Sequence, residues 1–236
     1  MKLLAGAAAA GALVLDVRRV RWAQACRIVP TRYPAVSLFD RVADAADFDA
    51  LYALEALSNE RSRQELGQID RVPRDERIFG PGSGPIMAAF THVNVLGSRF
   101  SDGRFGVFYA ARERATAVAE TRYHHGRFLL ATAEGPSHLP MRLYSVTIDA
   151  RLHDLRPQDS VAAAVYDSVD YSAARSLGYG LHVTGSAGVV YRSVRHAKGH
   201  CVGLFRPKGA SACQHAAYLL YAWDGQRFTD IYEKSE

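Results

Sequence analysis

The stretch Phe105-Gly-Val-Phe-Tyr-Ala-Ala111, which leads directly into Arg112-Glu-Arg-Ala-Thr-Ala-Val-Ala-Glu120, decides how this chain folds. Residues 105–111 are aromatic and rich in β-favouring side chains, which predicts a strand. From Arg112 to His125 the small and apolar residues recur at helical spacing, which predicts a helix. A strand that passes directly into a helix places Tyr109 and Glu120 close together along the path of the chain.

The residues that follow predict a sheet built chiefly from the second half of the chain. Within the expected strand at 141–148, the apolar Tyr144, Val146 and Ile148 alternate with the polar Ser145, Thr147 and Asp149, with the period of two that is typical of a half-exposed strand. Asp224-Gly-Gln226 separates two apolar runs and favours a hairpin. We expect a helix over 159–177 that is ended by Gly178 and Gly180, and strands at 128–133, 141–148, 189–194, 201–205, 217–223 and 227–232.

The first hundred residues predict mostly helices and loops. A short strand is expected at 26–29, and Asp47 can cap a helix that ends near 58–63. Residues 67–84 contain prolines and glycines that predict a loop, and Pro85 suits the first turn of a helix through Phe90. We therefore expect one α+β domain over residues 25–236, with a central β-sheet and helices mostly from the N-terminal half, preceded by a helical or disordered segment over residues 1–24.

Composition and charge are those of an ordinary globular protein. Hydrophobic residues make up 48% of the 236 residues, enough for a substantial core, and no Gly-, Ser- or Pro-rich linker divides the chain. The net charge of +5 comes from arginines scattered among acidic residues, with one cluster at Val17-Arg-Arg-Val-Arg21. Because the basic residues form no long stripe, we expect no direct binding to nucleic acid.

The cysteines and the N-terminus bear on the compartment. Cys26, Cys201 and Cys213 are too few for a disulfide framework, so we expect a reducing, cytoplasmic environment. Residues 1–15 resemble the charged start and apolar middle of a secretory signal, but they are too short to span a bilayer. An N-terminal helix or an upstream start codon explains them more simply, and we expect no membrane association.

Three polar residues stand in runs that are otherwise small or apolar: Arg99 in Gly97-Ser-Arg-Phe100, Glu120 in Ala117-Val-Ala-Glu120, and Ser193 in Gly188-Val-Val-Tyr-Arg-Ser193. A buried charge is costly unless another group pairs with it. We therefore expect the three side chains to meet in one polar pocket, and we look for chemistry there.

The side chains of this pocket match the needs of a dinucleotide substrate. Arginine offers a planar fork of donors for phosphate, and the nearby Tyr109 offers a ring face for stacking. A carboxylate such as Glu120 stabilises an oxocarbenium-like centre, as it does in glycoside cleavage. Each residue alone also has a structural interpretation, as a surface arginine, a core tyrosine, a solvated glutamate and an edge-strand serine, so the combination carries the hypothesis.

The same stretches carry a family resemblance. Gly97-Ser-Arg-Phe-Ser-Asp-Gly-Arg-Phe-Gly-Val-Phe-Tyr109, Ala117-Val-Ala-Glu120 and Gly188-Val-Val-Tyr-Arg-Ser-Val-Arg195 together resemble the RES domain, named for its arginine, glutamate and serine. These domains are the toxins of RES–Xre toxin–antitoxin pairs. The likeness extends upstream to Arg27-Ile-Val-Pro-Thr-Arg-Tyr33 and covers roughly residues 25–206. Phe100 departs from the pattern, because a tryptophan commonly follows the motif arginine.

The resemblance implies a fold similar to diphtheria-type ADP-ribosyltransferases and the consumption of NAD as co-substrate, without a metal. It implies that Glu120 is the catalytic carboxylate, that Arg99 binds NAD phosphate or ribose, and that Ser193 completes the nicotinamide-ribose site. Tyr109 would stack on nicotinamide, and Arg27 would be a second NAD contact. The expected partners are a cognate Xre-type antitoxin and, in one branch, a protein target such as phosphoribosyl pyrophosphate synthetase. The acceptor of ADP-ribose, whether protein, water or phosphate, stays open.

Three alternatives remain open at this stage. His200-Cys201 and Cys213-Gln-His215 offer four soft ligands for zinc, although neighbouring strand residues point to opposite faces. A ribonuclease toxin would draw acid and base groups from the nine histidines, including His124-His125 and His196. In a non-enzymatic interaction module the polar residues would be structural.

Overall fold

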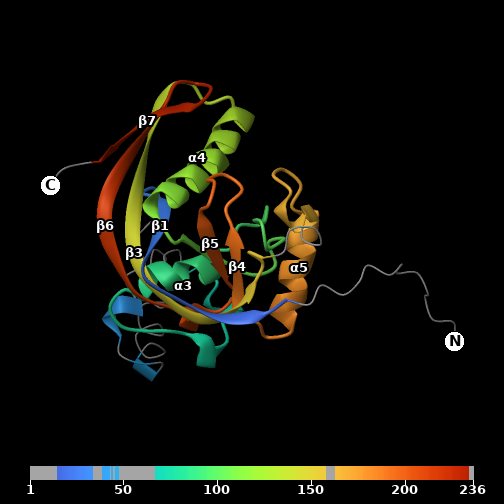
Figure 1. The fold of residues 1–236 in the computed structure, drawn as a ribbon. Coiled ribbons are helices and arrows are strands. Elements are labelled where there is room, and N and C mark those ends of the chain that lie inside the picture. Colours follow the sequence, from blue (N-terminus) through green and yellow to red (C-terminus); the bar gives the residue numbers. More distant parts are fainter. Residues whose placement is uncertain are drawn as a thin grey trace, which may run out of the picture.

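The computed structural model describes residues 15–33, 39–42, 44, 46–47, 67–157 and 163–233, which form one α+β domain (Figure 1). Its sheet has seven strands in the order β1-β2-β5-β4-β3-β6-β7. The strands are β1 (Val17–Pro30), β2 (Phe108–Ala111), β3 (Ser137–Asp154), β4 (Gly188–Arg192), β5 (His200–Leu204), β6 (Ala210–Trp223) and β7 (Phe228–Glu233). The longer described helices are α3 (Gly84–Thr91), α4 (Arg114–Ala131) and α5 (Ser172–Val183). Short 3-10 turns cover Phe39–Arg41, Ile69–Arg71, Arg74–Glu76, Ala163–Tyr166 and Pro207–Gly209.

Strand β3 connects the two parts of the sheet. It pairs antiparallel with β1 and with β6, and its last residues, His153 and Asp154, pair parallel to β4. Strand β1 also pairs with β2 through Cys26 and Ala111. Strands β1, β2, β5, β4 and β3 therefore close into a ring, while β6 and β7 extend the sheet beyond it (Figure 1).

The two faces of β3 pack into two different cores. The register with β6 shifts between Leu143 and Tyr144. Before the shift Met141 and Leu143 are buried in one core, and after it Tyr144, Val146 and Ile148 are buried in the other. Successive residues of a strand point to opposite faces, so the odd-numbered Met141 and Leu143 lie on one face of β3 and the even-numbered Tyr144, Val146 and Ile148 lie on the other. The alternation predicted from Tyr144 to Asp149 is confirmed.

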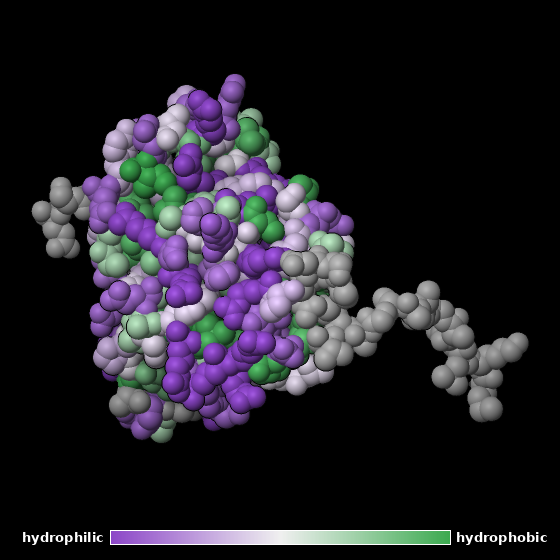
Figure 2. All heavy atoms as spheres, viewed as in Figure 1, coloured by the Kyte–Doolittle hydropathy of each residue, from purple (hydrophilic) through white to green (hydrophobic). Residues whose placement is uncertain are grey.

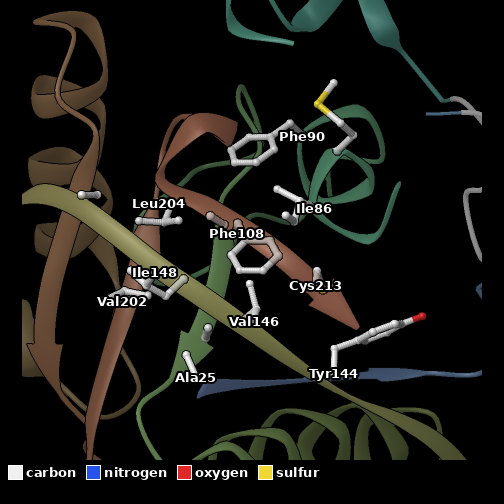
Figure 3. Close-up of a cluster of buried hydrophobic side chains, with 14 of the residues drawn as sticks. Ala25, Ile86, Phe90, Phe108, Tyr144, Val146, Ile148, Val202, Leu204 and Cys213 are labelled. Atoms are coloured by element: carbon white, nitrogen blue, oxygen red, sulfur yellow. The ribbon is translucent and has the colours of Figure 1, made fainter. Parts of the chain in front are cut away.

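The inner core lies within the ring of strands and is closed by α3. Every strand of the ring contributes side chains to it, because alternate residues of each strand point inward. Figure 3 shows the ring of Phe108 between Ile86 and Phe90 of α3 and Val146 of β3. The helix predicted from Pro85 through Phe90 is confirmed, since its buried residues Ile86, Met87 and Phe90 fill this end of the core.

The outer core lies on the other face of the same strands, beneath α4 and α5. Ala117 and Leu129 of α4 and Ala174 of α5 are buried there with Val189 and Tyr191 of β4. Figure 1 shows α4 and α5 on separate parts of this layer. The face drawn in Figure 2 is largely hydrophilic, with hydrophobic side chains in smaller groups. No described helix is long and apolar enough to cross a membrane.

Strand β1 is longer than the sequence predicts. It begins at Val17 rather than at residue 26, so the helical or disordered segment expected over residues 1–24 is wrong for residues 17–24. The physical reason is burial: Val20 and Trp22 face the inner core while the backbone pairs with β3. The expected strand at 26–29 is the last part of β1.

The strand predicted at 128–133 is also wrong, because α4 continues to Ala131. Leu129 is buried in the outer core at helical spacing from Val118, which packs against the same core, and this packing outweighs the local β-preference of Phe128. The helix ends where the Thr132 hydroxyl donates to the carbonyl of Phe128 and Ala133 takes a positive φ of 51°.

Gly178 and Gly180 do not end α5, which covers Ser172–Val183 and contains both. A Cβ atom on Gly178 would lie 2.1 Å from the carbonyl oxygen of Phe100, so the glycine permits close packing of the helix against that turn. The helix ends instead at Gly185, which follows the C-cap residue Thr184 and has a φ of +80°.

The other expectations are met in part. The loop over 67–84 contains only short 3-10 turns before α3, and the hairpin at Asp224-Gly-Gln226 joins β6 to β7. The predicted helix that begins at Asp47 lies almost wholly outside the described residues. The helix predicted at 159–177 is wrong for residues 163–171, which form a 3-10 turn at Ala163–Tyr166 and a loop before α5 begins at Ser172. The expected strands at 189–194 and 201–205 correspond to β4 and β5.

Candidate active site

The turn that carries Arg99 is held by its neighbours. The hydroxyl of Tyr109 on β2 accepts a hydrogen bond of 3.0 Å from the backbone N–H of Phe100 and lies 2.8 Å from the hydroxyl of Ser98. Arg175 of α5 donates from Nε to the carbonyl of Ser98 at 2.9 Å. Strand β2 and helix α5 thus fix the backbone on both sides of Arg99.

The guanidinium of Arg99 is buried, with the residue 5% exposed. Its Nη1 donates to the carbonyls of Val165 at 3.1 Å and Asp167 at 3.0 Å, and its Cζ lies 4.3 Å from the ring centroid of Tyr171. Its Nη2 is buried and has no hydrogen-bond partner among the described residues. Buried donors are nearly always paired in folded proteins, so an unpaired buried N–H at this position is unusual.

Ser193 and Glu120 are directly bonded. Ser193 follows β4, and its hydroxyl donates to Oε1 of Glu120 on α4 at 2.6 Å. The same Oγ accepts the backbone N–H groups of Arg195 and His196, each at 3.0 Å. Because two donors already point at the oxygen, the hydroxyl hydrogen is directed to the carboxylate. The serine therefore orients Glu120 and stabilises its charged form.

The environment of Glu120 favours the carboxylate. Burial by itself would raise the pKa of this carboxyl, but His124, the Ser193 hydroxyl and the charge of Arg99 together hold the pKa below its ordinary value. The side chain is 16% exposed, and Nε2 of His124, one helical turn along, lies 3.7 Å from Oε2. Glu120 is thus a partly buried anion near the buried guanidinium of Arg99.

Tyr171 and His124 join this cluster although sequence analysis did not assign them to it. The imidazole of His124 faces the ring of Tyr171, with 6.2 Å between the centroids, and Tyr171 in turn lies under Arg99. The spacing of four residues between Glu120 and His124 was a readable signal on a helix, whereas His124 was considered only for the ribonuclease alternative. No local pattern marks Tyr171, which precedes α5.

Tyr109 contributes its hydroxyl to the Arg99 turn and its ring to the sheet surface. A Cβ atom on Gly203, its partner on β5, would lie 3.3 Å from Cε1 of Tyr109, so the glycine leaves space for the ring. Burial raises the pKa of Tyr109 to about 12, and the phenol is neutral at physiological pH. The ring is half-buried beside the cluster.

Arg27 is not brought into this cluster. Its guanidinium lies 4.5 Å from the ring centroid of Phe108, in the inner core, and Nη1 donates to the carbonyl of Tyr109 at 2.9 Å. Burial lowers its pKa. The physical reason is strand alternation: Ile28 belongs to the outer core, so Arg27 points to the opposite face of β1. Arg99, Tyr109, Glu120 and Ser193 are the predicted site residues that come together.

The alternative ligands do not form a site in the described residues. No group of three or more His, Cys, Asp or Glu side chains gathers there in a way that could hold a metal ion. Burial raises the pKa of the Cys201 thiol and raises that of Cys213 to about 12, so both remain protonated thiols.

One cavity of about 110 Å³ lies away from the polar cluster. Phe105, His182 and Phe205 form its aromatic wall, with the rings of Phe105 and His182 stacked at 4.0 Å. Arg206 and Glu76 line it as well, 4.0 Å apart. None of its lining residues belongs to the cluster around Glu120.

The family model of the RES domain matches residues 74–224, and the chain therefore belongs to the RES domain family. The match contains the arginine, glutamate and serine whose side chains converge in the cluster. The resemblance seen in the sequence is thereby confirmed at the level of the family.

Two individual proteins are also similar. "Uncharacterized protein y4oC" of Sinorhizobium fredii (strain NBRC 101917 / NGR234) is 26% identical over 209 residues, which cover 87% of this chain and 85% of that protein. A chain in the crystal structure of the M. tuberculosis MbcT–MbcA toxin–antitoxin complex matches with a TM-score of 0.47 and 10% identity, covering 93% of this chain and 87% of that one.

Proposed function

We propose that this protein is a toxin that cleaves the bond between nicotinamide and ribose in NAD. The products depend on the acceptor: a protein side chain gives ADP-ribosylation, and water or phosphate gives NAD depletion. We propose further that the fold is of the ADP-ribosyltransferase type and that the protein acts in the cytoplasm with a cognate Xre-type antitoxin. Membership of the RES domain family supports this proposal.

One observation carries the site assignment: a buried guanidinium N–H, Nη2 of Arg99, is left without an acceptor near the partly buried carboxylate of Glu120. An unsatisfied buried donor is costly, and a ribose or phosphate oxygen of a bound dinucleotide would satisfy it. The two side chains suit NAD as the substrate. Arg99 offers a fixed cation for the diphosphate–ribose portion, and Glu120 offers an anion for the ribose carbon at which positive charge develops.

Glu120 and Ser193 supply the chemical step. When the C–N bond breaks, its electron pair moves to the nicotinamide nitrogen, which becomes neutral, and the ribose carbon becomes oxocarbenium-like. The Glu120 carboxylate stabilises that positive charge, and the Ser193 hydroxyl keeps the carboxylate oriented. The acceptor then forms a bond to the ribose carbon and releases a proton. Tyr109 supports the Arg99 turn and, we propose, stacks against nicotinamide.

The experiment is to incubate the purified protein with NAD and to identify products by mass spectrometry, with phosphate and with cell lysate in separate arms. We expect free nicotinamide together with ADP-ribose, ADP-ribose phosphate or a labelled protein. Glu120→Gln should reduce nicotinamide release by at least about a hundredfold, whereas Glu113→Gln, an exposed residue before the same helix, should not. Unchanged release by the Glu120 variant, or cleavage of RNA in place of NAD, would refute the proposal.

A further inference from the structure

The segment after Ser193 holds a second arginine that belongs to the same cluster. The Ser193 hydroxyl accepts the backbone N–H of Arg195, so the two residues share one turn. The turn is tied to α4, because Nδ1 of His196 lies 2.8 Å from the hydroxyl of Thr116. Its place between β4 and β5 brings it toward α4, as Figure 1 shows.

The guanidinium of Arg195 is fixed on three sides. Its Nη2 donates to the carbonyl of Ser168 and lies 3.3 Å from the hydroxyl of Tyr171, and its Cζ lies 3.2 Å from the ring centroid of Tyr123. Its Nε is buried and without a hydrogen-bond partner among the described residues. A cation that is held rigidly and keeps one donor unused is preorganised for an acceptor.

Arg195 and Arg99 flank a single tyrosine. Arg99 lies over the ring of Tyr171 and Arg195 contacts its hydroxyl, and each keeps one buried N–H without an acceptor. Neither forms an ion pair with a described carboxylate at 4.0 Å or less. The nearby Asp167 directs Oδ1 to the backbone N–H groups of Val169 and Asp170, each at 2.7 Å, and so closes its own turn.

We propose that Arg195 is a second binding residue of this site and that, with Arg99, it holds the diphosphate of the substrate. A diphosphate within a dinucleotide carries one negative charge on each phosphoryl group, and each guanidinium then takes one. A single carboxylate or phosphate ester would leave one of the two cations without its anion. The inference rests on the proposed function for the identity of the substrate, but the diphosphate site itself is measurable without turnover.

The test measures the binding of inorganic pyrophosphate by titration calorimetry to the full chain. Arg195→Gln should weaken binding by about 10- to 100-fold, the effect of losing a charge-assisted hydrogen bond. Arg195→Lys keeps the charge but loses the Nε donor, and it should bind with intermediate affinity. Arg104→Gln is the matched control: Arg104 also lies on an aromatic ring, 3.7 Å from the centroid of Tyr179, but belongs to the exposed surface, and this change should leave binding unaltered.

A structural role for Arg195 makes a different prediction. Loss of the contacts to Ser168 and Tyr171 would lower the unfolding midpoint without a selective loss of pyrophosphate affinity. Pyrophosphate that binds to the folded Gln variant as tightly as to the unaltered chain would overturn the proposal, and so would an absence of binding to the unaltered chain. If the Arg195→Gln variant does not fold, the Arg195→Lys variant replaces it in the test. Pyrophosphate that binds to the Lys variant as tightly as to the unaltered chain would then overturn the proposal.

Parallel NAD cleavage assays separate the two proposals. If pyrophosphate affinity depends on Arg195 but the unaltered chain leaves NAD intact, the diphosphate site stands and the proposed reaction fails. If NAD is cleaved and the Arg195→Gln variant has the KM of the unaltered chain, the reaction stands and the role of Arg195 fails. Together the proposals predict a KM for NAD raised about 10- to 100-fold in this variant, with a smaller change in kcat.

Discussion

Ser193 donates a hydrogen bond of 2.6 Å to Glu120, a residue 73 positions earlier in the chain. The bond joins the turn after β4 to the partly buried Glu120 of α4, and it orients the carboxylate and favours its charged form. The hydroxyl acts on Glu120 and not as a nucleophile, because its hydrogen is already directed to that carboxylate and two backbone N–H groups occupy its oxygen.

Replacing Ser193 by Ala should therefore change the pH dependence of catalysis. The hydroxyl helps to hold the pKa of Glu120 low, so its loss raises that pKa. Activity needs the carboxylate and falls as the pH drops through the Glu120 pKa, so the acid limb of the pH–rate profile should move to higher pH. We also expect a loss of about a hundredfold in kcat at neutral pH. Measured profiles with the same acid limb would contradict this role.

The packing of α5 against the Arg99 turn predicts opposite effects for two neighbouring glycines. Gly178→Ala places a Cβ atom 2.1 Å from the Phe100 carbonyl oxygen and should cost about 1–3 kcal/mol in the free energy of unfolding. Gly180→Ala meets no atom within 4 Å and should stabilise the helix by about 0.5–1 kcal/mol. Urea denaturation measures both. Equal effects would show that α5 and the turn are not in close contact.

The hydroxyl of Tyr109 should contribute to the order of the same turn. Tyr109→Phe removes the acceptor of the Phe100 N–H and the partner of Ser98, and we expect a loss of about 1–3 kcal/mol in the free energy of unfolding. The KM for NAD should rise because Arg99 is less firmly placed. Tyr218→Phe, at a tyrosine that is 44% exposed on β6, is the control and should change neither quantity.

A buried acid should make stability depend on pH. Burial of Asp154 would raise its pKa, but hydrogen bonds and the charge of Arg156 hold that pKa below the ordinary value. At a pH between the pKa of Asp154 in the folded state and its ordinary pKa in the unfolded state, the folded state binds fewer protons. The stabilisation present at neutral pH is therefore lost as the pH falls through these two pKa values. Denaturation at several pH values measures this. The free energy of unfolding of the Asp154→Asn variant should depend less on pH than that of the unaltered chain, and at neutral pH it should be lower by about 1–3 kcal/mol.

An exposed acid offers the matched comparison for Asp154. Asp149 is 42% exposed and lies 2.7 Å from Nε of Arg19. Surface ion pairs contribute about 0–1 kcal/mol, so Asp149→Asn should change the free energy of unfolding only slightly. If both substitutions had the same effect, burial would not be the property that makes the Asp154 pair important.

The elements that sequence analysis predicted correctly are those with a strong local pattern. The helix that bears Glu120 and the alternation from Tyr144 to Ile148 depend on neighbouring residues, and both are present. The end of α5 was not predictable, because the role of Gly178 depends on the distant Phe100. The continuation of α4 through Phe128 depends likewise on the outer core.

The same distinction applies to the site. Arg99, Glu120 and Ser193 stood out as polar residues in apolar runs, and their side chains do converge. Tyr171 had no local signal, because its ring enters the cluster only through the packing of the segment before α5. Arg27 was assigned to the cluster without knowledge of which face of β1 it occupies, and the ring of strands places it on the other one.

The closed ring of strands has a consequence during protein synthesis. Strand β1 is completed by β3, and β2 has no ladder partner of its own length until β5, which ends at Leu204. Contacts of such wide sequence separation form late in folding. The strands that position Tyr109 and Ser193 therefore cannot complete the ring until the chain has left the ribosome through Leu204, so the polar cluster around Glu120 assembles only late in translation.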